Sequence, residues 1–340
     1  MPSLFLTDSE RKRLASFPST ISDSDVIAYF TLSDNDKEQV PKTAAAYNRL
    51  GFALQLCTLR YMGFCPENLE SAPLNVVAYL AKQLGTGTVN LTDYGKRAHT
   101  RSDHYLAAQA YLHFRKATPT DLKLLSDWLV DRALEHDTPT LLLQLASQKL
   151  RHDKVVRLGL TVLERMITAA RAKANERTFA TVEPLLTSEL KQALNKLLVP
   201  EPDSNRTLLN WLRNRETSNT APSILEALKK LDHIRSYGVE GWDLSGINPN
   251  RVKLLAGLGR RSTNQILQRM APEKRYPILL VFLSQTAVDI TDEIIEMFDR
   301  CFMETYARAR RNLDDFRKSN SRATNEKVVV LGKLWVKVNN

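Results

Sequence analysis

The chain has 340 residues, of which 43% are hydrophobic and 25% charged, and its formal net charge is +10. Glycine and proline are sparse, at 12 and 14 residues, which argues against an all-β fold with many tight turns. The three cysteines are scattered without a C-x-x-C pair, which argues against a disulfide framework or a zinc site and fits a reducing compartment. No apolar run approaches the length of a bilayer span and the N-terminus lacks signal-peptide features, so we expect an intracellular protein of two or three helical domains.

The positive charge is concentrated in two parts of the chain. Residues 149–177 contain eight Lys or Arg against three Asp or Glu, and residues 206–275 contain thirteen against six. Each Lys or Arg that neutralises a phosphate releases condensed counterions, so such segments favour polyanionic partners. A basic surface that only keeps the protein soluble is the alternative.

Helix starts can be identified at several places. Thr7-x-x-Glu10 is a capping box, and Thr118-Pro119 and Thr138-Pro139 each combine an N-cap with proline at the first helical position. Strand-like runs occur only at Val328–Leu331 and Leu334–Val338. We therefore predict an all-α fold of tandem small helical bundles with helix-turn-helix-like elements and a helical connector, and two short strand segments near the end.

The segment Tyr47–Phe64 predicts a helix with two apolar faces, which is typical of the central helix of a bundle. Arg49 and Arg60 lie near its ends and are its only candidates for DNA contact. Surface ion pairs of little energetic value are the alternative role for both side chains.

The segment Tyr94–Arg115 interleaves basic and aromatic residues, a mixture that suits contacts with phosphates and base edges. The alternative is a helix start capped by Thr100 or Ser102 with a solvated arginine between them. Its histidines have no cysteine or closely spaced histidine beside them, so we expect no metal site. The candidates for DNA contact are Arg97, Arg101, His104 and Arg115.

Residues 141–170 predict two helices joined by a basic break at residues 149–154, an arrangement that resembles a helix-turn-helix. In that geometry the second helix enters the major groove. A generic helical hairpin gives the same pattern. The candidates for DNA contact here are Arg151, His152, Lys154 and Arg157.

Residues 254–265 place two glycines before a pair of arginines, and Ser262 or Thr263 can cap the helix that follows. Asparagine and glutamine side chains can read adenine through two hydrogen bonds. The alternative is an ordinary helix start, and the glycine spacing does not fit a nucleotide-binding loop. The candidates for DNA contact are Arg260, Arg261, Asn264 and Gln265.

The acidic segment Asp289–Asp299 has the spacing of a solvated helix face, and we expect it at a helix start. We find no Ser/His/Asp or Cys/His arrangement elsewhere. The sequence therefore predicts no catalytic residue, metal site, cofactor or small-molecule substrate in this chain.

Several sequence segments occur in the order that is expected for one protein family, and together they cover almost the whole chain. The most specific is Tyr47–Phe64, and the others are Leu6–Arg11, Tyr29–Ser33, Arg97–His104, Tyr111–Arg115, Val155–Arg165, Arg275–Leu283, Thr291–Asp299 and Asn325–Val328. In this order they resemble TnpA, the replicative transposase of the Tn-three family of unit transposons.

The resemblance implies two helical DNA-binding domains, residues 1–136 and 137–240, that recognise the transposon's terminal inverted repeats in double-stranded DNA. It implies a helical connector and dimerisation region at residues 241–340, with a homodimer as a candidate assembly. The family's catalytic core is an RNase H-like domain with an Asp-Asp-Glu triad and a divalent metal, and nothing here matches that triad. The ending Leu331–Asn340 departs from the family pattern, so we expect a truncated or frameshifted copy or an artificial boundary.

The resulting hypothesis is sequence-specific binding of terminal inverted repeats without catalysis in this chain, in the bacterial cytoplasm at the nucleoid. One alternative is a truncated end-binding regulator that blocks full-length transposase. The other is a helical scaffold that binds only proteins, for which salt-sensitive DNA binding is not expected.

Overall fold

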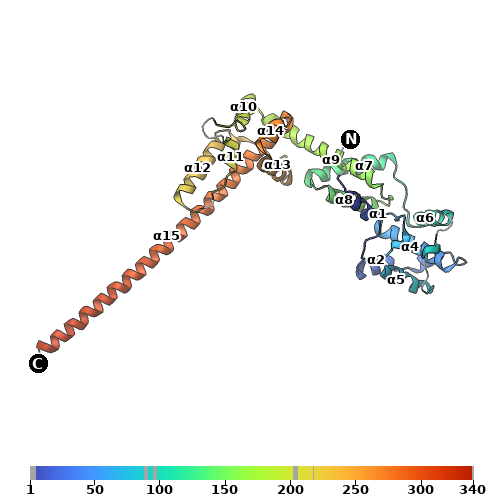
Figure 1. Cartoon of the computed structure of the whole chain (residues 1–340), viewed down its shortest axis with the longest axis horizontal. Coiled ribbons are helices and arrows are strands. Elements are labelled where there is room, and N and C mark those ends of the chain that lie inside the picture. The colour runs from blue at the N-terminus through green and yellow to red at the C-terminus, as the bar shows by residue number, and fades with distance from the viewer. Residues whose placement is uncertain (1–4, 88–90, 95–97, 202–205, 217, 339–340) are drawn as a thin grey trace. The chain divides into compact units, whose positions relative to one another are not determined.

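The computed structural model describes residues 5–87, 91–94, 98–201, 206–216 and 218–338 (Figure 1). Within these ranges all regular elements are helices, and two isolated β-bridges are the only strand-like pairings. The prediction of an all-α fold is confirmed. The chain forms two compact units, residues 1–178 and residues 179–340. The predicted division into modules at 136 and 240 is a different one, and it stays a prediction about DNA binding.

Unit 1 consists of nine α-helices and two short 3-10 helices in its described part. They are α1 (Asp8–Ala15), α2 (Asp23–Phe30), α3 (Asp34–Gln39), α4 (Ala46–Met62), η1 (Leu69–Ser71), α5 (Leu74–Leu84), η2 (Leu91–Asp93), α6 (Ala98–Leu112), α7 (Pro119–Glu135), α8 (Pro139–His152) and α9 (Leu160–Val182), the last of which runs past the unit boundary.

Unit 2 packs its shorter helices against the beginning of one very long helix. Its elements are η3 (Glu183–Leu185), α10 (Ser188–Lys196), α11 (Leu208–Arg213), α12 (Ala221–Arg235), η4 (Val239–Gly241), α13 (Pro249–Arg261), α14 (Asn264–Arg269) and α15 (Pro272–Val338).

The helix starts follow the capping signals of the sequence. Thr7 and Thr118 each form a complete capping box with the acidic residue three positions on, and α8 begins at Pro139 as predicted. Thr263 caps α14 through the backbone N–H of Ile266. The caps at Thr7, Thr118 and Thr263 are local interactions between residues three apart, whereas Thr138 makes no side-chain cap and α8 begins with the proline alone.

Helix α4 is the central helix of unit 1, as its two apolar faces predict. Leu50, Leu54 and Leu59 on it are fully buried. A Cβ atom at Gly51 would lie 2.3 Å from the ring of Tyr94, so the close approach of this ring requires glycine.

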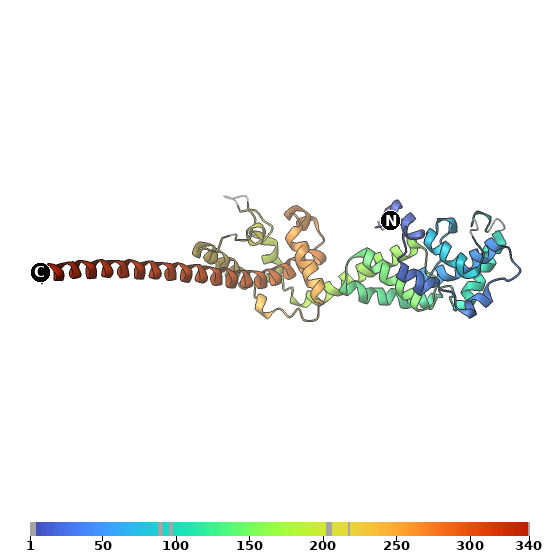
Figure 2. The same cartoon turned by 90° about the horizontal axis from the view of Figure 1, so that it is seen from below.

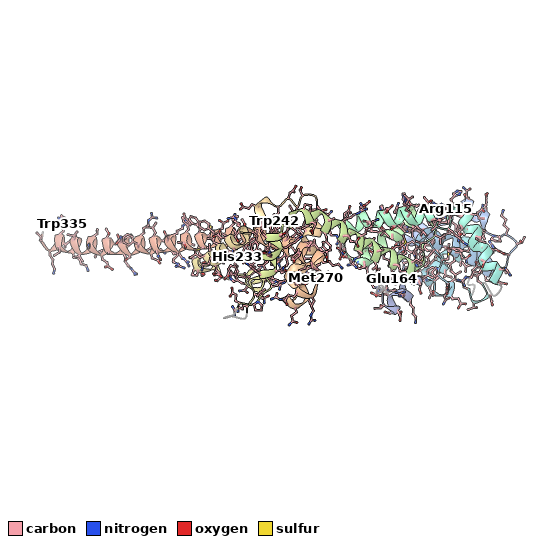
Figure 3. All side chains as sticks on the ribbon, turned by 90° about the horizontal axis from the view of Figure 1, so that it is seen from above. Arg115, Glu164, His233, Trp242, Met270 and Trp335 are labelled. Carbon is pink, nitrogen blue, oxygen red and sulfur yellow. The ribbon has the colours of Figure 1, made fainter. Side chains whose placement is uncertain are left out.

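A second core of unit 1 forms between α7, α8 and α9, and the N-terminal segment is fastened to it. The carboxylate of Glu164, which is fully buried, accepts a hydrogen bond from the backbone N–H of Leu6 at 2.9 Å and pairs with Arg11 at 2.6 Å (Glu164 is labelled in Figure 3). A buried carboxylate is stable only when it is paired and hydrogen-bonded, and here both conditions are met by the N-terminus.

The core of unit 2 is built around the first part of α15. Residues 278–283 of this helix are all buried, and α12 and α13 pack against it. Figure 2 shows that α15 continues well beyond the shorter helices of its own unit. Among the described residues no helix is long and apolar enough to cross a membrane.

Three local predictions are wrong. Val328–Leu331 and Leu334–Val338 are helical, within α15, because short apolar runs do not distinguish helix from strand and a helix pairs its own backbone groups. The acidic segment Asp289–Asp299 lies inside α15 and does not start a helix. Helix α6 begins at Ala98, so neither Thr100 nor Ser102 is its N-cap.

We predict that Leu54→Ala lowers the free energy of unfolding by about 2–5 kcal/mol, because it leaves a cavity around a fully buried side chain. The matched control is Leu106→Ala on α6, where the leucine is 57% exposed and the loss should be below about 0.5 kcal/mol. Urea denaturation of both variants measures the difference. Equal losses would contradict the central position of α4.

Candidate nucleic-acid interface

Two loops of unit 1 that are far apart in the sequence are joined by backbone hydrogen bonds. The N–H of Arg115 donates to the carbonyl of Lys154 at 2.9 Å, and the N–H of Val156 donates back to the carbonyl of Arg115 at 2.9 Å. These two bonds make the parallel bridge between Arg115 and Val155. We call residues 113–117 and 153–157 the paired loops; they connect α6 to α7 and α8 to α9.

Each paired loop contains a left-handed residue that is not glycine. His113 has φ = 59° and Lys154 has φ = 56°, the only positive φ values of non-glycine residues in the described chain. Each stands where a helix ends: the N–H of Phe114 reaches back to Gln109 and that of Val155 to Leu150, both at 2.8 Å. Glycine is the usual residue at such a helix end because the left-handed conformation strains other side chains.

The paired loops and the end of α8 carry a group of exposed cationic or ionisable side chains. We call them the basic cluster; they are His113, Arg115, Lys116, His152 and Lys154. The bridge brings the residues of the first loop beside those at 152 and 154, although about 40 residues of chain separate the two groups. The sequence analysis did not select His113 or Lys116. Their position directly after a helix end and beside Arg115 could have identified them as candidates.

Within the basic cluster Arg115 and Lys154 are held in different ways. The guanidinium of Arg115, labelled in Figure 3, pairs with both carboxylate oxygens of Asp121, and this hydrogen bond lowers the pKa of Asp121. The ammonium of Lys154 lies 5.1 Å from the ring centre of Phe114, and the side chain is exposed. Both can turn to a phosphate without unfolding the loop, since neither side chain is buried.

Two predicted contact residues from the same segment, Arg151 and Arg157, point into the protein. Arg151 donates to the carbonyl of Tyr61 at 2.5 Å. Arg157 donates to the carbonyl of Leu14 at 3.0 Å, and its guanidinium lies 3.3 Å from the ring centre of Phe64. Burial lowers the pKa of Arg157 to about 10.

The predicted residues on α4 and α6 are also engaged within unit 1. Arg49 donates to the carbonyl of Leu84 at 3.2 Å, and Arg101 donates to that of Pro66 at 3.1 Å. Arg60 pairs with Asp36 at 2.6 Å. A role of these side chains in DNA contact stays a prediction, and Arg97 lies outside the described residues.

Burial would raise the pKa of Asp36, but hydrogen bonds from the backbone of Ser33 and from Arg60 outweigh this effect, and the pKa is lowered. Asp36 is therefore an ionised partner that fixes Arg60. The sequence analysis gave a surface ion pair as the alternative role of Arg60. The structure contains an ion pair of Arg60, but its partner Asp36 is buried.

His104 lies in an aromatic pocket of unit 1. Its Nδ1 is 3.0 Å from the hydroxyl of Tyr94, and its ring packs edge-on against Phe52. Burial lowers the pKa of His104, although Asp103 nearby acts in the opposite direction. The lowered pKa favours the neutral imidazole at physiological pH, which suits its packing among aromatic rings.

Of the predicted contact residues of unit 2, some bond within the protein and others are exposed. Arg260 pairs with Asp289 at 2.5 Å, and the amide of Asn264 donates to the hydroxyl of Thr207 at 2.6 Å. Arg213, which the sequence analysis did not select, holds this turn by donating to the carbonyl of Ser262 at 2.8 Å. Exposed side chains at the α13–α14 turn and on α14 are Arg261, Gln265 and Arg269.

The helix-turn-helix prediction for α8 and α9 is not established by the geometry. Residues 153–159 connect the two helices, whereas a helix-turn-helix has a turn of about three or four residues. Basic residues on α9 reach acids across the bundle, as Arg171 does to Asp137 at 2.7 Å and Arg177 to Asp131 at 3.4 Å. The assignment of α9 as a recognition helix stays a prediction.

Other chemistry has little support from the described residues. They contain no group of three or more His, Cys, Asp or Glu that could hold a metal ion. Burial raises the pKa of Cys57 to about 12, so this thiol is not a nucleophile near neutral pH.

The first compact unit coincides with a described sequence family. A family model with the description "Domain of unknown function (DUF4158)" matches residues 5–170, which is nearly all of unit 1. Curated relatives that match far more of the chain are transposases.

The transposase for transposon Tn1546 of Enterococcus faecium is 32% identical over 303 residues, which is 88% of this chain and 31% of that protein. The transposases for Tn501 of Pseudomonas aeruginosa and for Tn21 of Escherichia coli are 30% and 27% identical, each over 97% of this chain and 33% of the relative. The chain thus spans about a third of the length of these relatives. The matches support the identification of the chain as an N-terminal, TnpA-like region of Tn-three-family transposases.

We predict a pH effect that depends on His104. Its pKa is lowered by folding, so the unfolded chain binds a proton more readily and stability falls as pH decreases through about 6.5. Replacing it as His104→Gln removes this titration. Unfolding free energies near neutral pH and near pH 5.5 should therefore differ more for the natural chain than for the variant. An equal difference would show that the imidazole is not desolvated.

We also predict that Lys154→Gly is more stable than Lys154→Ala by about 1 kcal/mol, because only glycine relieves the left-handed backbone. The alanine variant is the matched control, since both substitutions remove the ammonium group. Thermal and denaturant unfolding measure the order. If Lys154→Ala is the more stable variant, this position is not strained.

Proposed function

We propose that the chain binds double-stranded DNA at the terminal inverted repeats of a transposon, with the basic cluster of unit 1 as a principal contact. The observation that carries this proposal is the pair of left-handed residues, His113 and Lys154, in two loops that meet. Glycine would be favourable at both positions, yet both hold side chains that can carry positive charge. Strained positions of this kind are typical of functional sites.

The chemistry of the basic cluster suits the DNA backbone. Its side chains are exposed and already hydrated, so they can leave their present contacts at little cost. Lys116 and Lys154 act as point charges toward phosphates, and Arg115 can exchange the carboxylate of Asp121 for a phosphate, because both anions accept two parallel hydrogen bonds from a guanidinium.

Base reading is assigned in this proposal to side chains that remain exposed in unit 2. Gln265 can form two hydrogen bonds with adenine and Arg261 with guanine. Asn264 is less suited, since its amide already bonds Thr207 and accepts from Arg213 at 3.5 Å. Phosphate contacts would position the chain and these few contacts would specify the repeat.

The proposal gives this chain end recognition, and gives strand transfer to a catalytic domain outside it. The relatives are transposases, of which the chain spans about a third. Double-stranded DNA and a second copy of the chain are the proposed partners, and the bacterial nucleoid in the cytoplasm is the proposed location.

The direct test is binding of the purified chain to a duplex with its element's terminal repeat and to a scrambled duplex, across a salt series. We expect tighter binding to the repeat, and an affinity that falls with salt because counterions are released. Equal weak binding to both duplexes would contradict repeat recognition. No binding at low salt would contradict DNA binding altogether and favour the protein-binding scaffold.

We predict that Lys116→Ala and Lys154→Gly each weaken binding to all duplexes alike and lower the salt slope by about 0.9, the contribution of one phosphate contact. The matched control is Lys82→Ala on α5, an exposed lysine outside the basic cluster, which should leave the slope unchanged. Fluorescence anisotropy titrations measure these slopes. Unchanged slopes for both cluster variants would place the interface elsewhere.

A further inference from the structure

The N-terminal segment of unit 1 connects two hydrophobic cores. Leu6 is buried in the core that α7, α8 and α9 form. Phe17 and Ile21 are buried in the core around α4. We call residues 5–17 the strap; helix α1 is its middle part and crosses from one core to the other.

Helix α1 itself has little buried contact with the rest of unit 1. None of its eight residues is buried. A pocket of about 290 Å³ lies between one of its faces and α8, and a pocket of about 690 Å³ lies between another face and the start of α9. A segment with so few buried contacts opens locally at a much lower free energy than the whole unit unfolds. The docking of the strap therefore depends on how its ends are held.

Glu164 on α9 holds the N-terminal end of the strap. Its fully buried carboxylate accepts from the N–H of Leu6 at 2.9 Å and pairs with Arg11 at 2.6 Å, and both partners belong to the strap. A buried carboxylate without a partner is strongly unfavourable. If this end of the strap leaves, water has to enter the beginning of α9 to hydrate Glu164.

The strap also contacts the second of the paired loops directly. The guanidinium of Arg157, at the end of that loop, donates to the carbonyl of Leu14 on α1 at 3.0 Å. The Nε of Arg157 is buried and has no hydrogen-bond partner among the described residues. When α1 leaves, the guanidinium loses this acceptor as well and gains more by turning to solvent than by staying in place.

We propose that the strap is a conformational switch: docked on Glu164 it keeps residues 153–157 ordered, and its release loosens the loop that carries Lys154. The N-terminal end moves, while Phe17 and Ile21 stay in the core around α4. One element with two states, docked and released, thus couples a buried carboxylate to the basic cluster. The coupling does not depend on DNA, whereas its effect on DNA affinity rests on the proposed function.

Two backbone N–H groups of the loop report on this coupling. That of Val156 donates to the carbonyl of Arg115 and that of Arg157 to the carbonyl of Gly63, both at 2.9 Å. Neither hydrogen bond involves an atom of the strap. Faster exchange of these two amides after a change in the strap is therefore transmitted through the loop.

The experiment is amide hydrogen exchange of the full chain with Arg11→Glu, which places a second carboxylate beside Glu164 and so favours release. Exchange of the Val156 and Arg157 amides should become at least about tenfold faster, the effect of losing one charged hydrogen bond. Exchange on α5 should not change. Arg11→Lys keeps the positive charge and should retain most of the protection.

The matched control is Arg13→Glu, the same charge change at an exposed position of α1. It should leave the exchange of the loop unchanged. Faster exchange confined to the strap in the Arg11→Glu chain overturns the coupling. Equally faster exchange on α4 and α5 also overturns it, because the substitution then destabilises unit 1 as a whole.

Binding to the duplex with the terminal repeat separates this inference from the proposed function. Arg11→Glu should bind about tenfold more weakly than Arg13→Glu, because only molecules with an ordered loop are competent to bind. The two variants have the same net charge, so their general attraction to DNA is matched. Faster exchange of the loop with equal affinities supports the switch and contradicts the DNA interface at the paired loops.

Discussion

The arrangement of unit 1 depends on three backbone hydrogen bonds between segments that are far apart in the sequence. Arg115 and Val156 connect the loop after α6 with the loop after α8, and the N–H of Arg157 donates to the carbonyl of Gly63 at the end of α4. These bonds pair backbone groups of the loops that the neighbouring helices leave without partners. They also fix which side chains of the loops face solvent, and so they determine where the basic cluster lies.

Several arginines of this protein and the lysines of the paired loops have different roles. A guanidinium has five donors in a rigid fork, so it can hold several carbonyl groups of a loop at once. Arg101 and Arg213 each donate to two carbonyl groups, and Arg151 and Arg157 each donate to one. Lys116 and Lys154 of the paired loops stay exposed, since an ammonium group is strongly hydrated and costly to bury.

The sequence predicted the fold class, the helix starts after Thr7, Thr118 and Thr138 and the central helix correctly, because caps and apolar periodicity are encoded within a few residues. Sequence could not separate exposed arginines from those bonded to the backbone of the fold: Arg115 pairs with Asp121, whereas Arg151 donates to the carbonyl of Tyr61. It also gave no sign of the strained backbone at His113, which depends on the end of α6. The C-terminal strand prediction was wrong because Val328–Leu331 fits either period, and helix α15 continues through it.

The central claim is that the paired loops of unit 1 contact DNA. Amide hydrogen exchange of the purified chain, with and without a duplex that carries the terminal repeat, tests it most directly, because it reports on each loop without a substitution. The account predicts slower exchange in DNA-bound chain at residues 113–117 and 153–157, and unchanged exchange on α5. Protection confined to other segments, with the paired loops unchanged, would contradict it.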